Sequence, residues 1–149
     1  MDVFVYGTLT DPDRVRTVLE TDAATAAATF VGRATLEGLH RVDGRYPTLV
    51  PGGSADGRLL AVDNVGLERL DRYEGVDSGL YVRVAVPVAG QDDDLQEAAE
   101  RDRDDERCWV YLGDPDRLGV DATWPGDGPF RERVRAFVSH TDLAVRNHE

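Results

Sequence analysis

Apolar and polar positions follow first a strand-like and then a helix-like pattern at the start of the chain. An unbroken apolar run, Val3 to Tyr6, ends at Gly7, which predicts a buried strand followed by a tight turn. Asp11 and Pro12 are typical of a helix start, as the N-cap and the first helical residue. Apolar residues at helical spacing continue toward residue 20: Val15, Val18 and Leu19.

The next part of the chain favours strands. Extended segments are expected at residues 30–41, 46–50 and 58–62. Gly32 and Gly38 are expected to be bulges or bends within the first of these, and Pro51-Gly52-Gly53 is expected to end the second. The Ala/Thr-rich segment 21–29 fits either a longer first helix or a loose connector.

The second half of the chain predicts two helices and two strands. A helix is expected from Asp63 or Asn64 to about Tyr73, with Gly75 as its stop. The other expected elements are an alternating strand at 81–88, a strand at 108–112, a turn-rich loop at 114–128, a C-terminal helix at about 129–139 and a frayed polar tail after 141. The fold class is therefore α+β with a strongly bent or closed sheet, in a single domain of residues 1–149.

Composition narrows the choice of partners. The net charge is −12, and all 17 basic residues are Arg, which argues against nucleic acid as a partner. We favour adaptation of the surface to high salt; the alternative is a high-GC codon bias with an acidic partner-binding face. No apolar stretch reaches the length of a membrane span, so a cytoplasmic protein without membrane contact is expected. The small size and highly charged surface favour a monomer. The single Cys108 lies in an apolar strand pattern, which favours a buried structural thiol.

The acidic segment 90–107 interrupts the strand pattern and is interpreted as a hairpin insertion. Runs of Asp can bind a divalent cation. This segment lacks the alternating ligands and the mid-loop Gly of a calcium loop, so a solvated charge run is the favoured interpretation.

Glu74 is the residue whose position is unusual. It lies four residues after Leu70 and seven after Leu67, so its carboxylate shares the apolar face of the helix at the helix's last turn. Burial and the negative end of the helix dipole both raise the pKa of a carboxyl group, which suits a general acid or base near neutrality. The alternative is that the helix ends one residue earlier and Glu74 faces solvent.

The turn after the first strand and one later strand carry weaker signals. Backbone N–H groups of a strand-glycine-helix turn can bind an anion, although most such turns bind nothing. Tyr81 and Arg83 share a strand face, and Arg83 fits an ion pair with Glu74, a substrate carboxylate or an exposed partner.

Two signatures together resemble the γ-glutamylcyclotransferase-like family, which includes the AIG2-like group. Val3-Phe-Val-Tyr-Gly-Thr-Leu9 is similar to its opening motif. Leu70-Asp-Arg-Tyr-Glu-Gly75, followed by Tyr81-Val-Arg83, is similar to its second. Gly44-Arg-Tyr-Pro47 and Trp109-Val-Tyr-Leu112 fit its intermediate and late strands, so the resemblance spans about residues 3–113.

The resemblance implies a mixed, barrel-like sheet with short flanking helices and a cavity beside the first turn. It implies that the turn holds a small γ-glutamyl substrate and that Glu74 is the acid/base, with release of 5-oxoproline and no metal or cofactor. The substrate-binding residues that it implies are Tyr6, Gly7, Thr8, Leu9 and Tyr81. Two alternatives stay open: a non-catalytic member of this fold that binds a metabolite or a protein, and an interaction module that uses residues 90–107.

Overall fold

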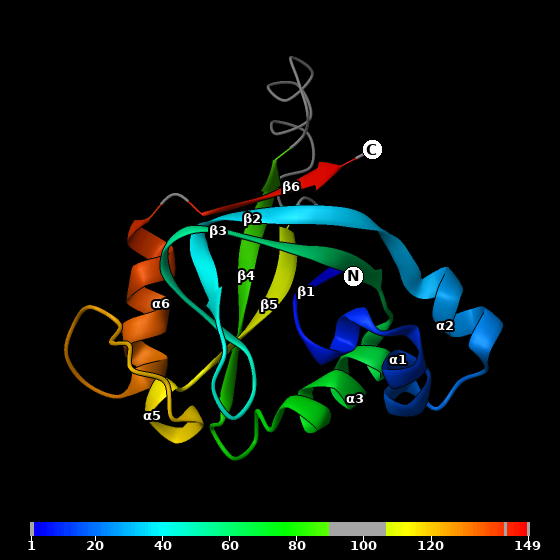
Figure 1. The fold of residues 1–149 in the computed structure, drawn as a ribbon, viewed down its shortest axis with the longest axis horizontal. Coiled ribbons are helices and arrows are strands. Elements are labelled where there is room, and N and C mark those ends of the chain that lie inside the picture. The colour runs from blue at the N-terminus through cyan, green and yellow to red at the C-terminus, as the bar shows by residue number, and fades with distance from the viewer. Residues whose placement is uncertain (1, 90–106, 142, 149) are drawn as a thin grey trace.

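The computed structural model describes residues 2–89, 107–141 and 143–148. Its strands form a closed barrel in the order β1-β3-β2-β6-β4-β5 (Figure 1). In chain order the elements are β1 (Asp2–Val5), the 3₁₀ turn η1 (Thr8–Thr10), α1 (Pro12–Leu19), α2 (Ala23–Thr29), β2 (Phe30–Val42), β3 (Thr48–Ala61), α3 (Asn64–Glu74), β4 (Tyr81–Ala89), β5 (Arg107–Gly113), α5 (Pro115–Leu118), α6 (Phe130–His140) and β6 (Ala144–His148).

The barrel is mixed, as the expected fold class requires. β1 runs parallel to β5, with Asp2 opposite Cys108, and β4 runs parallel to β6. The remaining neighbours are antiparallel: β1 with β3, β2 with β3, β2 with β6, and β4 with β5. Because the first strand meets the fifth, the two ends of the sheet join, and the prediction of a closed sheet with short helices is confirmed.

Side chains alternate between the inside and the outside of the barrel wall. In β1 and the residue that follows it, Phe4 and Tyr6 belong to the interior core, whereas Val3 and Val5 belong to a second core outside the wall. β4 alternates in the same way, since Val82, Val84 and Val86 all lie in the interior core. This period of two confirms the predicted strand. Cys108 also lies in the interior, where burial raises the pKa of its thiol to about 12.

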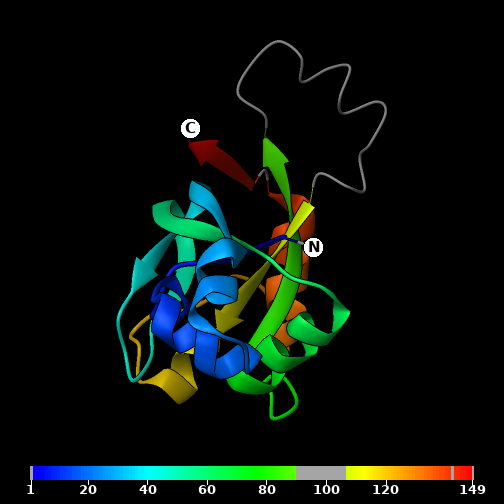
Figure 2. The same cartoon turned by 90° about the vertical axis from the view of Figure 1, so that its right-hand side faces the viewer.

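Helices cover the barrel on two sides. Figure 2 shows α1, α2 and α3 together on one side, with α6 beyond the barrel. The outer core lies between α1–α3 and the wall and includes Val15, Leu67 and Leu70. α6 packs against the interior core through Val134, beside the fully buried Trp124 of the preceding loop. The predicted C-terminal helix is thus present and shifted by one residue.

Strand β2 contains both predicted bulges. Its pairing with β3 shifts register between Phe30 and Gly32 and again between Glu37 and Leu39, around Gly38. The prediction that the chain breaks after residue 50 is wrong, because β3 is a single strand of 14 residues. Gly52 and Gly53 lie within it at φ +108° and +67°, opposite the second bulge, so they bend the strand without ending it.

Three further expectations need correction. Residues 21–29 are neither a continuation of α1 nor a loose connector, since Asp22 accepts a hydrogen bond from the Thr25 N–H and begins a separate helix. The loop at 114–128 contains the short helix α5. The described part of the tail after 141 is not frayed: β6 pairs with β2 and β4, and both Val145 on this strand and Leu143 just before it are buried. The acidic insertion predicted at 90–107 lies outside the described residues except for Arg107, which pairs with Pro87 across the antiparallel strands on either side of it.

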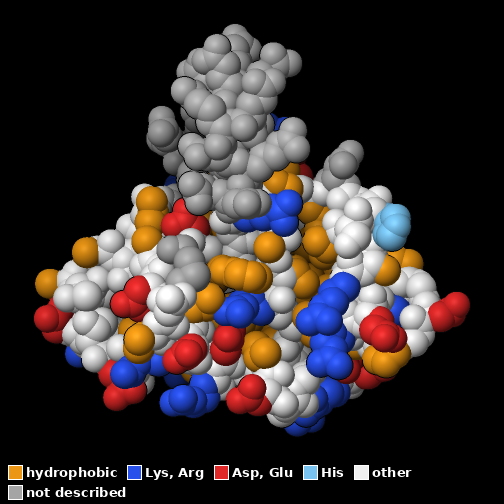
Figure 3. Space-filling view, turned by 180° about the vertical axis from the view of Figure 1, so that it is seen from behind, with side chains coloured by type: hydrophobic (Ala, Val, Ile, Leu, Met, Phe, Trp, Pro, Cys, Tyr) orange, Lys and Arg blue, Asp and Glu red, His pale blue; other side chains and the backbone are white. Residues whose placement is uncertain are grey.

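The surface mixes both signs of charge. On the face shown in Figure 3, Arg and acidic side chains are interspersed. None of the helices in the described ranges has the length and apolarity needed to cross a membrane.

Candidate active site

A cavity of about 470 Å³ opens between the turn after β1, the end of α3 and the start of β4. The catalytic and substrate-binding residues that the resemblance implied all line it: Tyr6, Gly7, Thr8, Leu9, Glu74 and Tyr81. The structure therefore brings the two signatures together although about 65 residues separate them in the chain. The roles of these residues are addressed below.

The turn after β1 forms one wall of the cavity. The Thr10 N–H and hydroxyl both donate to the Gly7 carbonyl, at 3.0 and 2.7 Å, and the Asp11 N–H donates to the Thr8 carbonyl. Asp11 then accepts a hydrogen bond from the Asp13 N–H and begins α1, as predicted. The first N–H groups of such a helical turn have no partner within it, so they can bind a ligand.

Gly7 packs closely against Pro47. A Cβ at this position would lie 3.1 Å from Pro47 Cγ, a contact that the rigid proline ring does not easily relieve. The sequence indicated that a Gly here permits a close approach, and Pro47 is the neighbour concerned.

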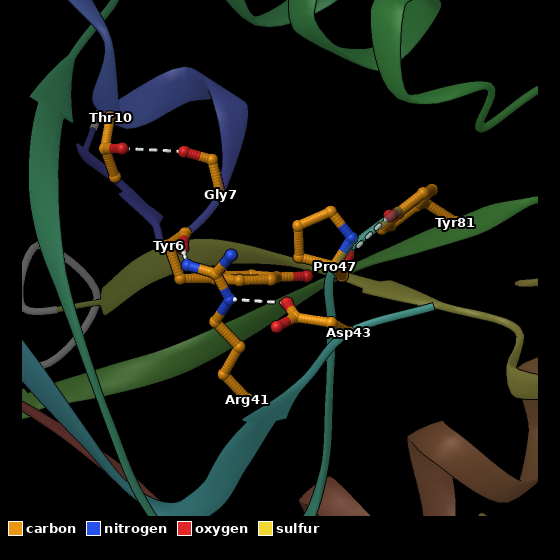
Figure 4. Close-up of polar contacts among 7 residues, drawn as sticks. All are labelled: Tyr6, Gly7, Thr10, Arg41, Asp43, Pro47 and Tyr81. Atoms are coloured by element: carbon orange, nitrogen blue, oxygen red, sulfur yellow. Dashed lines mark hydrogen bonds and ion pairs between the residues drawn. The ribbon is translucent and has the colours of Figure 1, made fainter. Parts of the chain in front are cut away.

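Polar contacts behind the turn fix its orientation (Figure 4). Arg41 donates to the Tyr6 carbonyl at 2.8 Å, and its Nε is held by Asp43 at 3.1 Å. The C=O and N–H of a trans peptide point in opposite directions, so holding the Tyr6 carbonyl on Arg41 also sets the direction of the Gly7 N–H. The Tyr6 side chain itself points into the barrel and donates to the Tyr111 carbonyl, so the backbone of Tyr6 is the part that the turn presents.

Helix α3 forms the opposite wall and places Glu74. Asp63 caps its start by accepting a hydrogen bond from the Gly66 N–H at 2.8 Å, and Leu67 and Leu70 are buried against the barrel. Glu74 is its last residue. Gly75 follows at φ +73° and ends the helix in a Schellman motif: its N–H and that of the next residue donate to carbonyls of the last turn. The expected position of Glu74 on the apolar face of the last turn is confirmed.

The Glu74 side chain is half-buried at the cavity wall and has no compensating partner in the part of the chain that the structure describes. Among the described residues it makes no hydrogen bond or ion pair, and it is the only acidic residue in the described cavity lining. Burial raises its pKa from 4.5 to about 7. Such a group changes protonation state near neutrality, as a proton-transfer residue must.

This burial predicts a pH-dependent loss of stability. Between about pH 4.5 and 7, Glu74 is protonated in the folded chain and ionised in the unfolded chain, so raising the pH favours unfolding. A shift of this size corresponds to about 3 kcal/mol, complete above the folded-state pKa. We expect the unfolding free energy of Glu74→Gln, relative to wild type, to rise by about that amount between about pH 5 and pH 8 in urea titrations. If the unfolding free energies of the two proteins changed in parallel with pH, the raised pKa of Glu74 would be contradicted.

Five tyrosines in the described ranges line the cavity, and the pKa of three of them, Tyr6, Tyr81 and Tyr111, is affected by Glu74. Tyr81 donates to the Pro47 carbonyl at 2.6 Å, and Tyr111 donates to Asp71 at 2.7 Å. Burial raises the pKa of Tyr6, Tyr81 and Tyr111 above the usual value for a phenol, and the nearby Glu74 charge acts in the same direction. These phenols therefore stay neutral at the pH at which Glu74 titrates.

Arg83 does not pair with Glu74, which was one of the partners considered. It forms an ion pair with Asp71 at 3.2 Å, with both side chains about a quarter exposed, and stacks over the Trp109 ring at 4.3 Å. Asp71 also accepts the Tyr111 hydrogen bond. This chain of contacts ties α3 to β4 and β5 and so holds the helix that carries Glu74.

Several lining residues were not expected as site residues, among them Arg14, Tyr46, Tyr73 and Tyr111. Tyr73 closes one edge of the cavity, since its hydroxyl lies 2.8 Å from the Thr8 hydroxyl. A signal for Tyr111 existed in the alternation of β5, which puts it on the same face as Trp109. In the part of the chain that the structure describes, no group of three His, Cys, Asp or Glu side chains is placed to hold a metal ion.

Comparison with known proteins identifies clear relatives. The family model described as "Gamma-glutamyl cyclotransferase, AIG2-like" matches residues 3–128. AIG2-like protein A of Arabidopsis thaliana is 33% identical over 122 residues, which are 79% of this chain and 67% of that protein. A solution structure of an Arabidopsis thaliana protein is 30% identical at a TM-score of 0.52, covering 91% of this chain and 80% of its own. A structure named gamma-glutamyl cyclotransferase has a TM-score of 0.56, with 95% and 99% coverage; at 18% identity it shows the fold alone.

Proposed function

The chain belongs to the gamma-glutamyl cyclotransferase, AIG2-like family, and from this premise we propose that it converts a small γ-glutamyl compound into 5-oxoproline and a free amine or amino acid. The observation that carries the proposal is the position of Glu74. Its half-buried carboxylate lines the same cavity as the turn Tyr6-Gly-Thr-Leu9, and its pKa is raised to about 7. This pairing supplies an anion-binding backbone and a proton-transfer group in one cavity.

The turn is proposed to hold the glutamyl end of the substrate. The backbone N–H groups of Gly7, Thr8 and Leu9 are suited to the α-carboxylate or to the oxyanion that develops on the γ-carbonyl. Leu9 is 3% exposed and Tyr6 points into the barrel, so these residues contribute backbone rather than side chain. Tyr81, which is anchored on the Pro47 carbonyl, is proposed to border the substrate on the other side.

The substrate supplies its own nucleophile. The α-nitrogen attacks the γ-carbonyl carbon, the new C–N bond closes a five-membered ring, and the amide C–N bond to the leaving group breaks. The attack is intramolecular. Holding the substrate in a folded conformation removes much of the entropic part of the activation barrier. The two protons that leave the α-ammonium end on the departing amine, so the reaction consumes no water and the charges balance.

Glu74 is proposed to move the proton. Ionised, it takes a proton from the α-ammonium and leaves a neutral amine that can attack. Protonated, it gives that proton to the leaving nitrogen as the amide bond breaks. The second proton leaves the attacking nitrogen once the new C–N bond has formed and ends on the departing amine, which is released as an ammonium ion. A pKa of about 7 makes both forms accessible at neutral pH, and the neutral tyrosines around it do not compete for the proton. The reaction in this form requires no cofactor.

The test is a panel of γ-glutamyl amino acids and γ-glutamyl amines incubated with the purified protein. Formation of 5-oxoproline and of one equivalent of the matching amine, followed by mass spectrometry, is the expected result. Thermal stabilisation of the protein by these compounds without turnover would instead support the alternative of a non-catalytic binding protein. A panel that gives neither turnover nor stabilisation would contradict both.

A further inference from the structure

A second, shallower hollow adjoins the cavity between α1 and α3. It has a volume of about 260 Å³, and its charged lining residues are Arg14, Glu20, Arg69 and Arg72. Arg14 and Tyr73 line both hollows, so the two share an edge. The Thr8 and Tyr73 hydroxyls, 2.8 Å apart, lie at that edge. A ligand that fills the cavity and extends past this edge reaches the arginines.

The positive charge of this hollow is only partly neutralised. Glu20 pairs with Arg69. The side chains of Arg14 and Arg72 make no hydrogen bond or ion pair with the residues that the structure describes. The hollow beside the cavity therefore contains two guanidinium groups without an acidic partner among the described residues. This is unexpected on a chain whose net charge is −12. The planar guanidinium of Arg binds a carboxylate through two parallel hydrogen bonds, and both side chains are exposed and free to do so.

Because the glutamyl end is proposed to lie at the turn and Glu74, the free end of the substrate is the leaving amine. We infer, on the basis of the proposed function, that Arg14 together with Arg72 forms a subsite for an anionic group on the leaving amine. Arg14 is then the residue that sets specificity, because it alone of the two also lines the cavity. The preferred substrates are γ-glutamyl compounds whose amine part carries a carboxylate, rather than neutral or cationic γ-glutamyl amines.

The experiment compares γ-glutamylglycine with γ-glutamylglycinamide, which have nearly the same size and differ in the charge of the leaving amine. We expect wild type to prefer the acid in kcat/KM by about 2- to 5-fold, the range for one exposed charge pair. In Arg14→Gln this preference falls to about 1. Arg72→Gln reduces it in part. Arg16→Gln, on the same helix and outside both hollows, keeps the wild-type preference.

Salt provides a readout that a structural role of Arg14 would not produce. Raising ionic strength from about 0.1 to about 1 M shortens the screening length from about 10 to about 3 Å, so the wild-type preference falls and that of Arg14→Gln does not change. Circular dichroism confirms that each variant is folded.

The possible outcomes separate this inference from the function on which it rests. Equal kcat/KM for the two substrates in wild type, or an unchanged preference in Arg14→Gln, overturns the subsite and leaves the cyclotransferase proposal standing. If neither substrate gives 5-oxoproline, binding to wild type is measured by calorimetry. Tighter binding of the acid than of the amide, lost in Arg14→Gln, then supports the subsite without the reaction, and equal or absent binding overturns it.

Discussion

Replacing Glu74 by Gln is expected to lower the rate of 5-oxoproline formation by roughly 10²- to 10⁴-fold, the range of a general acid/base contribution. Gln keeps the shape of the side chain and removes the titrating proton. The carboxylate makes no hydrogen bond or ion pair with other described residues, so the exchange breaks no internal contact. Substrate affinity, measured by calorimetry, is expected to change little, because the glutamyl end is proposed to bind to the turn.

The control for this variant is Glu68→Gln, which makes the same chemical change at an exposed position of the same helix. In wild type, kcat is expected to rise with pH through a midpoint near the Glu74 pKa of about 7, since the ionised form begins the reaction. Glu68→Gln should keep that profile. A Glu74→Gln protein with near wild-type turnover would show that another group moves the proton.

Replacing Val145 by Asp is expected to unfold the protein or to destabilise it by more than about 4 kcal/mol. Val145 is 0% exposed in the interior core, and it lies on β6, the strand between β2 and β4 in the barrel. An Asp there either places an unpaired carboxylate in the core or detaches β6 and opens the barrel. Urea unfolding followed by circular dichroism measures the loss.

Two milder variants make this test quantitative. Val145→Ala keeps the strand and leaves a small cavity, with an expected loss of about 2 kcal/mol. Arg146→Gln changes the next residue, an exposed side chain that pairs with Glu37 at 2.8 Å, and should cost less than about 1 kcal/mol. If Val145→Asp were as stable as Arg146→Gln, β6 would not be part of the folded barrel in solution.

Local sequence signals were sufficient wherever a boundary depends on neighbours in the chain. Asp11 and Asp63 were both recognisable as N-caps, and each accepts the expected backbone hydrogen bond. Gly75 was recognisable as a helix stop and lies at φ +73°. The alternation of β4 identified its buried face, because a strand has one core-facing side chain in every two.

The errors arose where a partner strand decides the outcome. Pro51-Gly52-Gly53 carries the usual signals of a strand end, yet β3 continues, because the bulge around Gly38 bends β2 at the same place and pairing resumes at Ser54 opposite Glu37. The segment after 141 has too few apolar residues to indicate a strand alone. Its two buried residues, Leu143 and Val145, gain their burial only from the closed barrel.

The candidate site, like the fold, was predictable only where its residues carry a local sequence signal. The turn and Glu74 were found because each has a local signal: a glycine after an apolar run, and a carboxylate on the apolar face of a helix. Tyr111 and Arg14 reach the same cavity from β5 and α1, and their positions depend on barrel closure and helix packing. The Asp71 partner of Arg83 was missed because two carboxylates of α3 were within plausible reach of that strand, and only the structure shows which one pairs.

The parallel pairing of β1 with β5 also decides when the cavity comes into existence during synthesis of the chain. Tyr6 hydrogen-bonds to the Tyr111 carbonyl, a partner 105 residues later. Contacts of such separation form slowly, because a long loop must close before they give any stabilisation. The turn after β1 leaves the ribosome early, but one wall of its cavity is made about a hundred residues later. A nascent chain therefore carries the turn that is proposed to bind the substrate, but the cavity is incomplete until β5 has emerged. A truncated product of translation that stops before β5 is expected to lack the proposed activity.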